Sequence, residues 1–290
     1  MRGRVYRCTV GLPAARLSFV MPEPTSSPPP SALPPLAKGT LYLVATPIGN
    51  LEDITLRAIR TLRECDLVAA EDTRRSGQLL RHLGISKRMI SCFAHNERRR
   101  ADEVVSLLRT GGIVALVSDA GTPGISDPGE RLARCVLEAG FRVESVPGPC
   151  ALVSALTASG LPTGEFHFIG FLPTKSGQRS RRLGEILRLP GTLVIYESPY
   201  RVEKLLVELA SLVPQRAVVM ARELTKRHEE YLRGTAETLL QVWKERPRKG
   251  EFVVMIAPAL EGDNEMECTS APETELASPE SEESVIADGE

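Results

Sequence analysis

Short apolar runs rich in β-branched residues alternate with amphipathic stretches along most of this chain, and this alternation constrains the fold more than any other feature. In the first half, the expected strands are 41–46, 67–70, 113–118 and 143–146, and the expected helices lie near 97–109 and 129–139. Alternating strands and helices predict a mostly parallel sheet with helices on both faces. Asn50 is the expected N-cap of a helix along which Ile54, Ala58 and Leu62 recur at i, i+4 and i+8.

The pattern starts again after the Gly- and Pro-bearing segment 160–164. Here the expected strands are 166–171, 193–196, 217–222 and 252–257, and the expected helices lie near 178–188, 200–211 and 235–244. The predicted fold class is therefore α/β, with one domain at 39–160, a second at 161–258 and a cleft between them. No sequence repeat relates the two halves.

The two ends of the chain differ in composition from this body. Residues 1–38 hold 8 of the 22 prolines, so we expect a disordered leader. It has no continuous apolar segment, which argues against a signal peptide, while its few arginines are compatible with a transit peptide and Met21 is an alternative start. Residues 259–290 carry eleven acids and no Lys or Arg, which predicts a disordered acidic tail.

The acidic tail conceals a basic body. The whole chain has a formal net charge of −1, but residues 39–258 carry 31 basic and 25 acidic side chains. This surplus favours a polyanionic partner. No run of 18 apolar residues is present, so no membrane span is expected. The six cysteines show no C-x-x-C pair and no zinc-like spacing to histidine, which predicts reduced thiols in a cytoplasmic protein and no metal site.

Ligands of open α/β sheets bind beyond the carboxyl ends of the strands, where this chain has four unusual junctions. The first, at 46–50, holds a single glycine, so both the G-x-G-x-x-G dinucleotide fingerprint and the phosphate-binding P-loop are absent. The second, at 71–75, reads E-D-T-R-R. Either Asp72 or Thr73 is the expected N-cap of a helix, which leaves Glu71 and Arg74 facing the crevice.

The third junction is the most specific. Residues 118–129 contain three glycines and two prolines, which predicts a rigid loop whose backbone groups approach a ligand closely. The fourth, V-P-G-P-C-A at 146–151, follows the last strand of the first half and repeats this logic.

At these residues the chain resembles a known family. The motifs that carry the resemblance are V-A-T-P-I-G-N-L-E-D-I-T at 44–55, E-D-T-R at 71–74, F-A-H-N-E at 93–97, S-D-A-G-T-P-G-I-S-D-P-G at 118–129, V-P-G-P at 146–149, S-G-L-P-T at 159–163, G-F-L-P at 170–173, E-S-P-Y-R at 197–201 and R-E-L-T-K at 222–226. Together they resemble the small-subunit ribosomal RNA methyltransferases of the tetrapyrrole-methylase superfamily. The resemblance spans residues 39–258 and departs from the family at Cys150, where the family usually has Ser.

This resemblance implies two α/β domains, usually paired into a homodimer, with S-adenosylmethionine bound in the inter-domain cleft. The implied reaction is 2′-O-methylation of a cytidine ribose in the decoding region of 16S ribosomal RNA, with no role for DNA or a membrane. By analogy, the cofactor contacts are Pro47, Gly49, Ser118, Asp119, Gly121, Pro123, Gly124, Ile125, Ser126, Pro147, Gly148, Ala151, Leu172 and Pro173.

A ribose hydroxyl is a weak nucleophile, so a proton acceptor is expected within hydrogen-bond reach. Our hypothesis is that Asp72 or Glu71 accepts the proton and that Arg74 orients the ribose or its phosphate. The basic side chains expected nearest the cleft, and so to contact RNA phosphates, are Lys175, Arg179, Arg181 and Arg182. His95 either lines the site or is a hydrogen-bonded structural residue.

Two other functions remain open at this point. One is methylation of a tetrapyrrole carbon by another member of the superfamily, which the basic body and the motifs at 71–74 and 118–124 disfavour. The other is a non-catalytic ribosome-assembly factor that binds RNA, which the intact cleft motifs disfavour.

Overall fold

The computed structural model describes residues 34–93 and 95–259. The expected disorder up to residue 33 and in the acidic tail from residue 260 lies outside the described residues. Within the described part, no helix is long and apolar enough to cross a membrane.

The first sheet is entirely parallel, as the alternating pattern predicts. Its five strands lie in the order β3-β2-β4-β1-β5. They are β1 (Thr40–Val44), β2 (Leu67–Ala70), β3 (Met89–Ser91), β4 (Ile113–Val117) and β5 (Arg142–Val146). Every residue of β2 is buried, as expected of an inner strand covered on both faces.

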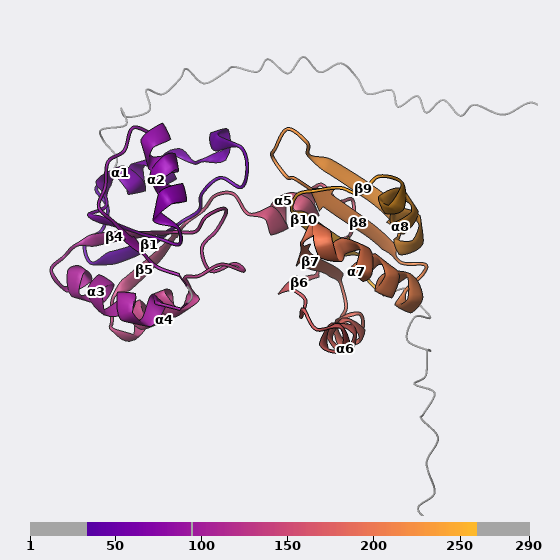
Figure 1. Cartoon of the computed structure of the whole chain (residues 1–290). Helices are drawn as coiled ribbons and strands as arrows, with labels where there is room; N and C mark the ends of the chain where they lie inside the picture. The colour runs from indigo at the N-terminus through magenta and orange to yellow at the C-terminus, as the bar shows by residue number, and fades with distance from the viewer. Residues whose placement is uncertain (1–33, 94, 260–290) are drawn as a thin grey trace, which may run out of the picture. The chain divides into compact units, whose positions relative to one another are not determined.

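Helices cover both faces of this sheet. They are α1 (Leu56–Glu64), α2 (Thr73–His82), α3 (Glu97–Arg109) and α4 (Glu130–Glu138). Figure 1 shows α1 and α2 on the side of the sheet opposite α3 and α4. Apolar residues of α3 and α4, such as Val104 and Leu132, share a buried cluster with Leu41 of β1 and Leu116 of β4. This packing fixes the strand ends from which the functional loops leave.

The second sheet has five strands in the order β6-β7-β10-β8-β9. They are β6 (Phe166–Phe171), β7 (Thr192–Glu197), β8 (Ala217–Arg222), β9 (Glu230–Thr235) and β10 (Phe252–Ile256). Only β6 and β7 pair in parallel, whereas β10 pairs antiparallel with β7 and β8, and β8 with β9. The expectation of a mostly parallel sheet is therefore wrong here, because a run of apolar residues does not reveal the direction of a strand.

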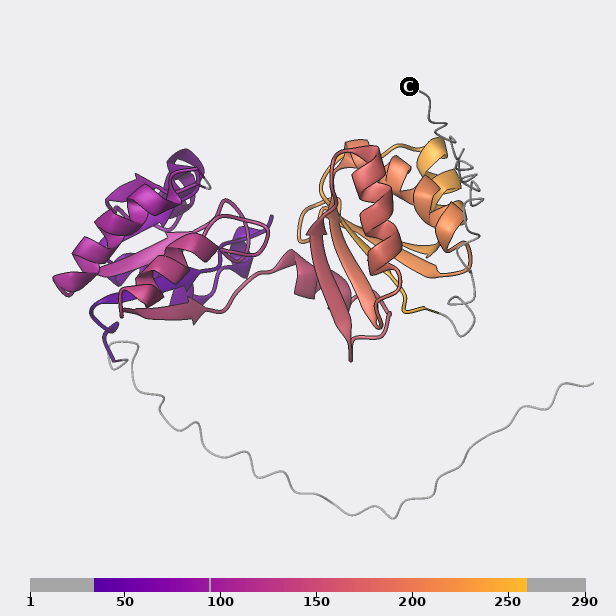
Figure 2. The same cartoon turned by 90° about the horizontal axis from the view of Figure 1, so that it is seen from below.

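Three helices cover one face of the second sheet, and a fourth covers the other. On the first face, α6 (Ser176–Ile186), α7 (Pro199–Leu212) and α8 (Ala236–Glu245) enclose the largest buried cluster. Figure 2 shows these helices gathered on one side of the strands. On the opposite face, Leu152 and Ala155 of α5 (Ala151–Thr157) pack against β-strand residues such as Val194. Three of these elements were not predicted from sequence periodicity: the short strand β3, helix α5 and strand β9.

The packing of α5 bears on the expected division of the chain at residue 160. Although α5 precedes that point, its apolar side contacts the sheet formed by β6 to β10.

The helix start expected at Asn50 is wrong. Asn50 caps only a 3-10 turn, Leu51–Asp53, and the Thr55 hydroxyl caps α1 by accepting the Ala58 N–H.

Candidate active site

The loops that follow β1, β4 and β5 are joined at the carboxyl edge of the first sheet. Thr46 and Gly121 exchange backbone hydrogen bonds, with N–H to carbonyl distances of 2.9 and 3.0 Å. The Thr122 hydroxyl donates to the Pro149 carbonyl at 3.0 Å, which ties the loop after β4 to the turn after β5. Three of the four junctions singled out in the sequence therefore meet in space, because their strands are neighbours.

The fourth junction, after β2, is fixed to the same loops by carboxylates. The Asp72 N–H donates to Oδ1 of Asp119 at 3.0 Å, and the Asp119 N–H donates to Oε2 of Glu71 at 3.3 Å. Arg75 forms an ion pair with Asp119 at 3.2 Å. These contacts hold Glu71 and Asp72 beside the start of the glycine-rich loop.

Backbone strain marks the segments around the site. Among the described residues, the non-glycine residues with positive φ are Ser126, Glu223 and Thr225. Such conformations persist where the surrounding structure enforces them, which is common at functional sites. A buried carboxylate holds the end of the glycine-rich loop, since Glu97 of α3 accepts the Gly129 N–H at 2.5 Å and is 4% exposed. Glu97 is the last residue of the F-A-H-N-E motif, but no role was predicted for it.

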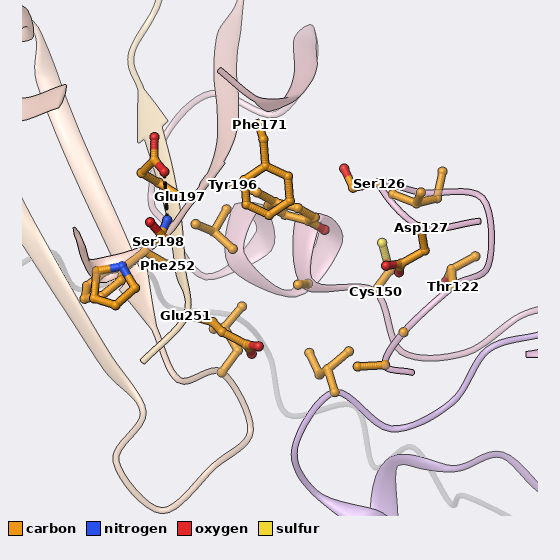
Figure 3. Close-up of a pocket in the computed structure, with 18 residues that line it drawn as sticks. Thr122, Ser126, Asp127, Cys150, Phe171, Tyr196, Glu197, Ser198, Glu251 and Phe252 are labelled. Carbon is orange, nitrogen blue, oxygen red and sulfur yellow. Dashed lines mark hydrogen bonds between the residues drawn. The ribbon is translucent and has the colours of Figure 1, made fainter. Parts of the chain in front are cut away.

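A cavity of ≈ 310 Å³ lies against the glycine-rich loop. This volume is at the lower end of the range for small-molecule sites. Its lining comes from the loops after β1, β4 and β8, the start of α5, residues at or just after the ends of β6 and β7, and the start of β10. Figure 3 shows Thr122, Asp127 and Cys150 near one another, and Phe171 and Tyr196 stacked edge to face, with ring centroids 5.8 Å apart.

The predicted cofactor contacts divide into three groups. The first group lines the cavity and comprises Gly121, Ile125, Ser126 and Ala151. The second lines a separate cavity of ≈ 260 Å³ and comprises Pro47 and Asp119. The remaining residues line neither of these cavities: Gly49, Ser118, Pro123, Gly124, Pro147, Gly148, Leu172 and Pro173. Contact of any of them with a cofactor stays a prediction.

Two of the remaining glycines have packing roles. A Cβ on Gly148 would lie 2.8 Å from the Cβ of Ala45, and a Cβ on Gly49 would lie 2.4 Å from Cγ of Lys226. Only glycine therefore lets these loops approach β1 and the segment after β8 so closely. The Asn50 N–H strengthens the second approach by donating to the Thr225 hydroxyl at 3.1 Å.

The carboxylates near the site differ in basicity. Burial raises the pKa of Glu71. Hydrogen bonds from Arg74 lower the pKa of Asp72 to about 2, and Asp72 also caps α2 by accepting the Arg74 N–H. Burial and neighbouring acids raise the pKa of Asp127, which lines the cavity, to about 7. Of the two predicted proton acceptors, Glu71 is therefore the stronger base. Asp127 belongs to the motif at 118–129, but no role was predicted for its carboxylate.

Arg201 of α7 holds the turn after β6. Its Nη2 donates to the carbonyls of Leu172 and Pro173 at 2.6 and 3.2 Å, and its Nε lies 3.3 Å from Oε1 of Glu197. Oε2 of Glu197 is buried and makes no hydrogen bond to a described residue, and burial raises the pKa of this carboxyl group. The E-S-P-Y-R motif thus positions the G-F-L-P motif.

The predicted RNA contacts are not equivalent. Lys175, directly before α6, and Arg181 and Arg182, in the middle of that helix, are exposed, whereas the Arg179 side chain is 7% exposed and paired with Glu208 at 2.6 Å. Arg179 presents no free guanidinium face to a phosphate, so we correct its predicted role to a structural one. His95 is exposed beside Phe93, with ring centroids 6.4 Å apart.

Comparisons with known proteins give the family. Residues 40–240 match the family described as Tetrapyrrole (Corrin/Porphyrin) Methylases. A protein of Halalkalibacterium halodurans named ribosomal RNA small subunit methyltransferase I is 48% identical over 219 residues, covering 76% of each chain. The chain belongs to the ribosomal RNA small subunit methyltransferase I family. Relatives of the same name from Synechocystis and Escherichia coli O157:H7 are each 47% identical, over 78% and 76% of this chain and 81% and 78% of their own.

Solved structures of other proteins share the fold of this chain. Uroporphyrin-III C-methyltransferase of Thermus thermophilus has a TM-score of 0.54 at 22% identity, covering 76% of this chain and 94% of its own. A structure of that enzyme complexed with S-adenosyl homocysteine has the same TM-score and identity, with coverages of 74% and 96%. Diphthine synthase has a TM-score of 0.59 at 16% identity, with coverages of 76% and 90%.

No metal centre accompanies the cavity in the described ranges, 34–93 and 95–259. No group of three or more His, Cys, Asp or Glu side chains there is arranged to hold an ion. The described cysteines, Cys65, Cys92, Cys135 and Cys150, are free thiols, and burial raises the pKa of Cys65 to about 11 and that of Cys92 to about 12.

Proposed function

We propose that this protein transfers a methyl group from S-adenosylmethionine to the 2′-hydroxyl of a cytidine ribose in the decoding region of 16S ribosomal RNA. The observation that carries the proposal is that four of the segments identified in the sequence contribute residues to the lining of one cavity: the glycine-rich loop, the turn after β5, and the G-F-L-P and E-S-P-Y-R motifs. Hydrogen bonds join the first of these segments to the second and the third to the fourth. The names of relatives that are 44–48% identical support a ribosomal RNA substrate.

The cavity has the chemistry that S-adenosylmethionine requires. Apolar and aromatic side chains such as Ile48, Phe171 and Tyr196 would accept the adenosine, and backbone groups of 120–122 would bind its polar atoms. Asp127 would supply negative charge. The bound cofactor supplies an activated methyl group on a sulfonium, so the protein has to align the nucleophile and remove its proton.

We propose that Glu71 accepts the proton of the ribose hydroxyl and that Asp72 acts through Arg74. The raised pKa of Glu71 favours this role, because a stronger base removes a proton more readily. The Arg74 guanidinium donates to Asp72 at 2.9 and 3.1 Å, while the Arg74 side chain as a whole is 87% exposed and so is accessible to a ribose or phosphate.

The exposed basic groups Lys175, Arg181 and Arg182 are our proposed phosphate contacts. The surplus of basic side chains in residues 39–258 supports a polyanionic partner. We propose that the protein acts in the cytoplasm, as a homodimer of two α/β domains per subunit with the cofactor cleft between these domains.

The test is methyl incorporation with labelled S-adenosylmethionine into small ribosomal subunits from a strain that lacks this gene, followed by mass mapping of ribose methylation. The expected product is one 2′-O-methylcytidine in the decoding region. Glu71→Gln should lower turnover at least tenfold, and Asp72→Asn, which keeps a side-chain cap, should lower it less. Binding of the cofactor without incorporation into RNA would favour the assembly-factor alternative, and methylation of a precorrin-type substrate would favour the tetrapyrrole alternative.

A further inference from the structure

Asp127 is the acidic side chain that the loop after β4 contributes to the cavity. It follows Ser126, whose φ of 62° is held in the left-handed region, and Figure 3 shows its carboxylate near Cys150 and Thr122. None of the hydrogen bonds or ion pairs of the described residues involves this carboxylate. A half-buried carboxylate without a protein partner in a ligand-sized cavity indicates a ligand that supplies the partner.

The surroundings of Asp127 add negative charge. Burial acts most strongly on its pKa, and the acids Glu71, Asp119 and Glu251 raise it further. Two of these acids have cations of their own, since Arg75 lies 3.2 Å from Asp119 and Lys226 lies 2.9 Å from Glu251. None of the groups acting on Asp127 is a cation.

The other titratable side chains that line the cavity do not supply a cation either. They are Cys150, Tyr196, Glu197 and Glu251. Burial raises the pKa of Tyr196, so its phenol stays neutral at pH 7, and its oxygen accepts the Leu152 N–H at 2.9 Å. The rings of Tyr196 and Phe171 add faces that attract cations.

We infer that Asp127 recognises the positive charge of the methyl donor and thereby distinguishes S-adenosylmethionine from S-adenosylhomocysteine. The inference rests on the proposed function and names the residue that makes the cavity selective. The donor and S-adenosylhomocysteine share an amino-acid end with an ammonium and a carboxylate, and the donor carries one further positive charge on a three-coordinate sulfur. When that sulfur loses the methyl carbon to the ribose oxygen, it keeps the bonding electron pair and becomes a neutral thioether, while the hydroxyl proton leaves to a base. Asp127 then loses its partner, which weakens binding of the spent cofactor.

Recognition of a cation by a carboxylate that titrates near pH 7 makes binding depend on pH. A bound cation favours the ionised carboxylate and so lowers its pKa, and the protein releases a proton on binding. For each unit by which cation binding lowers the pKa of Asp127, the affinity at a pH above both pKa values is about tenfold higher than the affinity at a pH below them. A ligand with an uncharged thioether at the sulfur position, such as S-adenosylhomocysteine, gains nothing from this effect.

The experiment is titration calorimetry of the whole protein at pH 6 and pH 8 with three ligands: S-adenosylmethionine, S-adenosylhomocysteine and sinefungin, which carries an ammonium group in place of the methylsulfonium. Buffers of different ionisation enthalpy report the protons released. We expect the affinities for S-adenosylmethionine and sinefungin to rise about tenfold between pH 6 and pH 8 with proton release, and the affinity for S-adenosylhomocysteine to stay constant. Asp127→Asn should remove the pH dependence of binding and the preference for the charged ligands over S-adenosylhomocysteine. The control variant Asp102→Asn, on the exposed side of α3, should keep both properties.

Equal pH dependence for all three ligands in the wild-type protein would overturn the inference, and this measurement does not require the variant to fold. Unchanged binding of all three ligands by Asp127→Asn, together with lost methyl transfer, would also overturn it and assign Asp127 to proton transfer. Failure of the wild-type protein to bind S-adenosylmethionine at either pH would instead overturn the proposed function, and the inference with it.

Discussion

Replacing Arg179 with methionine tests whether this side chain stabilises the fold or binds RNA. Its guanidinium makes hydrogen bonds of 3.2, 3.2 and 2.6 Å to the Glu208 carboxylate, and the two side chains are 7% and 19% exposed. Methionine keeps most of the aliphatic stem but leaves Glu208 with only the Ser180 hydroxyl at 3.3 Å. Removing one partner of a fully buried pair costs about 3–5 kcal/mol, and the partial exposure of Glu208 places this pair near about 3 kcal/mol.

The assay is thermal unfolding combined with RNA binding at several salt concentrations. At about 2–4 °C per kcal/mol for a protein of this size, Arg179→Met should lower the Tm by about 6–12 °C. The additional change Glu208→Leu should recover much of the loss, because it removes the unpaired carboxylate. The salt dependence of RNA binding should stay unchanged, whereas Arg181→Ala should reduce the slope by about 0.7–0.9 without altering the Tm. An Arg179→Met protein with wild-type Tm and a reduced slope would refute this reasoning.

Three further predictions follow from local geometry. Arg201→Ala removes both hydrogen bonds to the carbonyls at 172 and 173, so calorimetry should show weaker S-adenosylmethionine binding by about tenfold, and binding as tight as wild type would contradict the positioning role. Gly191→Ala places a Cβ 2.5 Å from a backbone oxygen at a φ of 78°, so urea unfolding should show a loss of about 1–3 kcal/mol, whereas Gly184→Ala, with open space around its Cβ, should be neutral or stabilising. Burial lifts the pKa of Asp127 from 3.8 to about 7, so the stability that this group contributes is present below pH 4 and lost as the pH rises through 7. Asp127→Asn should therefore raise the Tm of the ligand-free protein at pH 8 but not at pH 4, and equal effects at both pH values would count against it.

The sequence predicted the first sheet well because parallel strands covered on both faces appear as separate apolar runs. Helix α3 and strand β2 begin and end where the periodicity places them. Strand β9 was missed because its six residues are all partly or fully exposed, so it carries no apolar signature. Helix α5 is only seven residues long, too short for its period to stand out from the apolar segment around it.

The candidate site also has features that could be predicted from the sequence and features that could not. The loops were predictable because strand ends in a parallel sheet converge and because glycine and proline mark sharp turns. The role of Arg179 had a sequence signal that charge counting hides. Arg179, Leu183 and Ile186 lie at i, i+4 and i+7, which is the buried stripe of α6. No local pattern indicated that Glu97 would reach the backbone of Gly129, since 32 residues separate them.

The two ligands in the proposed reaction have opposite charges, and the protein separates its own charges accordingly. The cavity is lined by the acids Asp127, Glu197 and Glu251, whereas Lys175, Arg181 and Arg182 are exposed just before and within α6. Charges that face water are screened over about 8–10 Å at ordinary salt, while half-buried groups are screened much less. A carboxylate recessed in the cavity therefore attracts a small cation at short range and repels an approaching phosphate only weakly. Under the proposed function, this arrangement would allow one protein to bind a cationic donor and a polyanionic acceptor at the same time, since the recessed carboxylates would attract the donor and the exposed basic side chains would attract the acceptor.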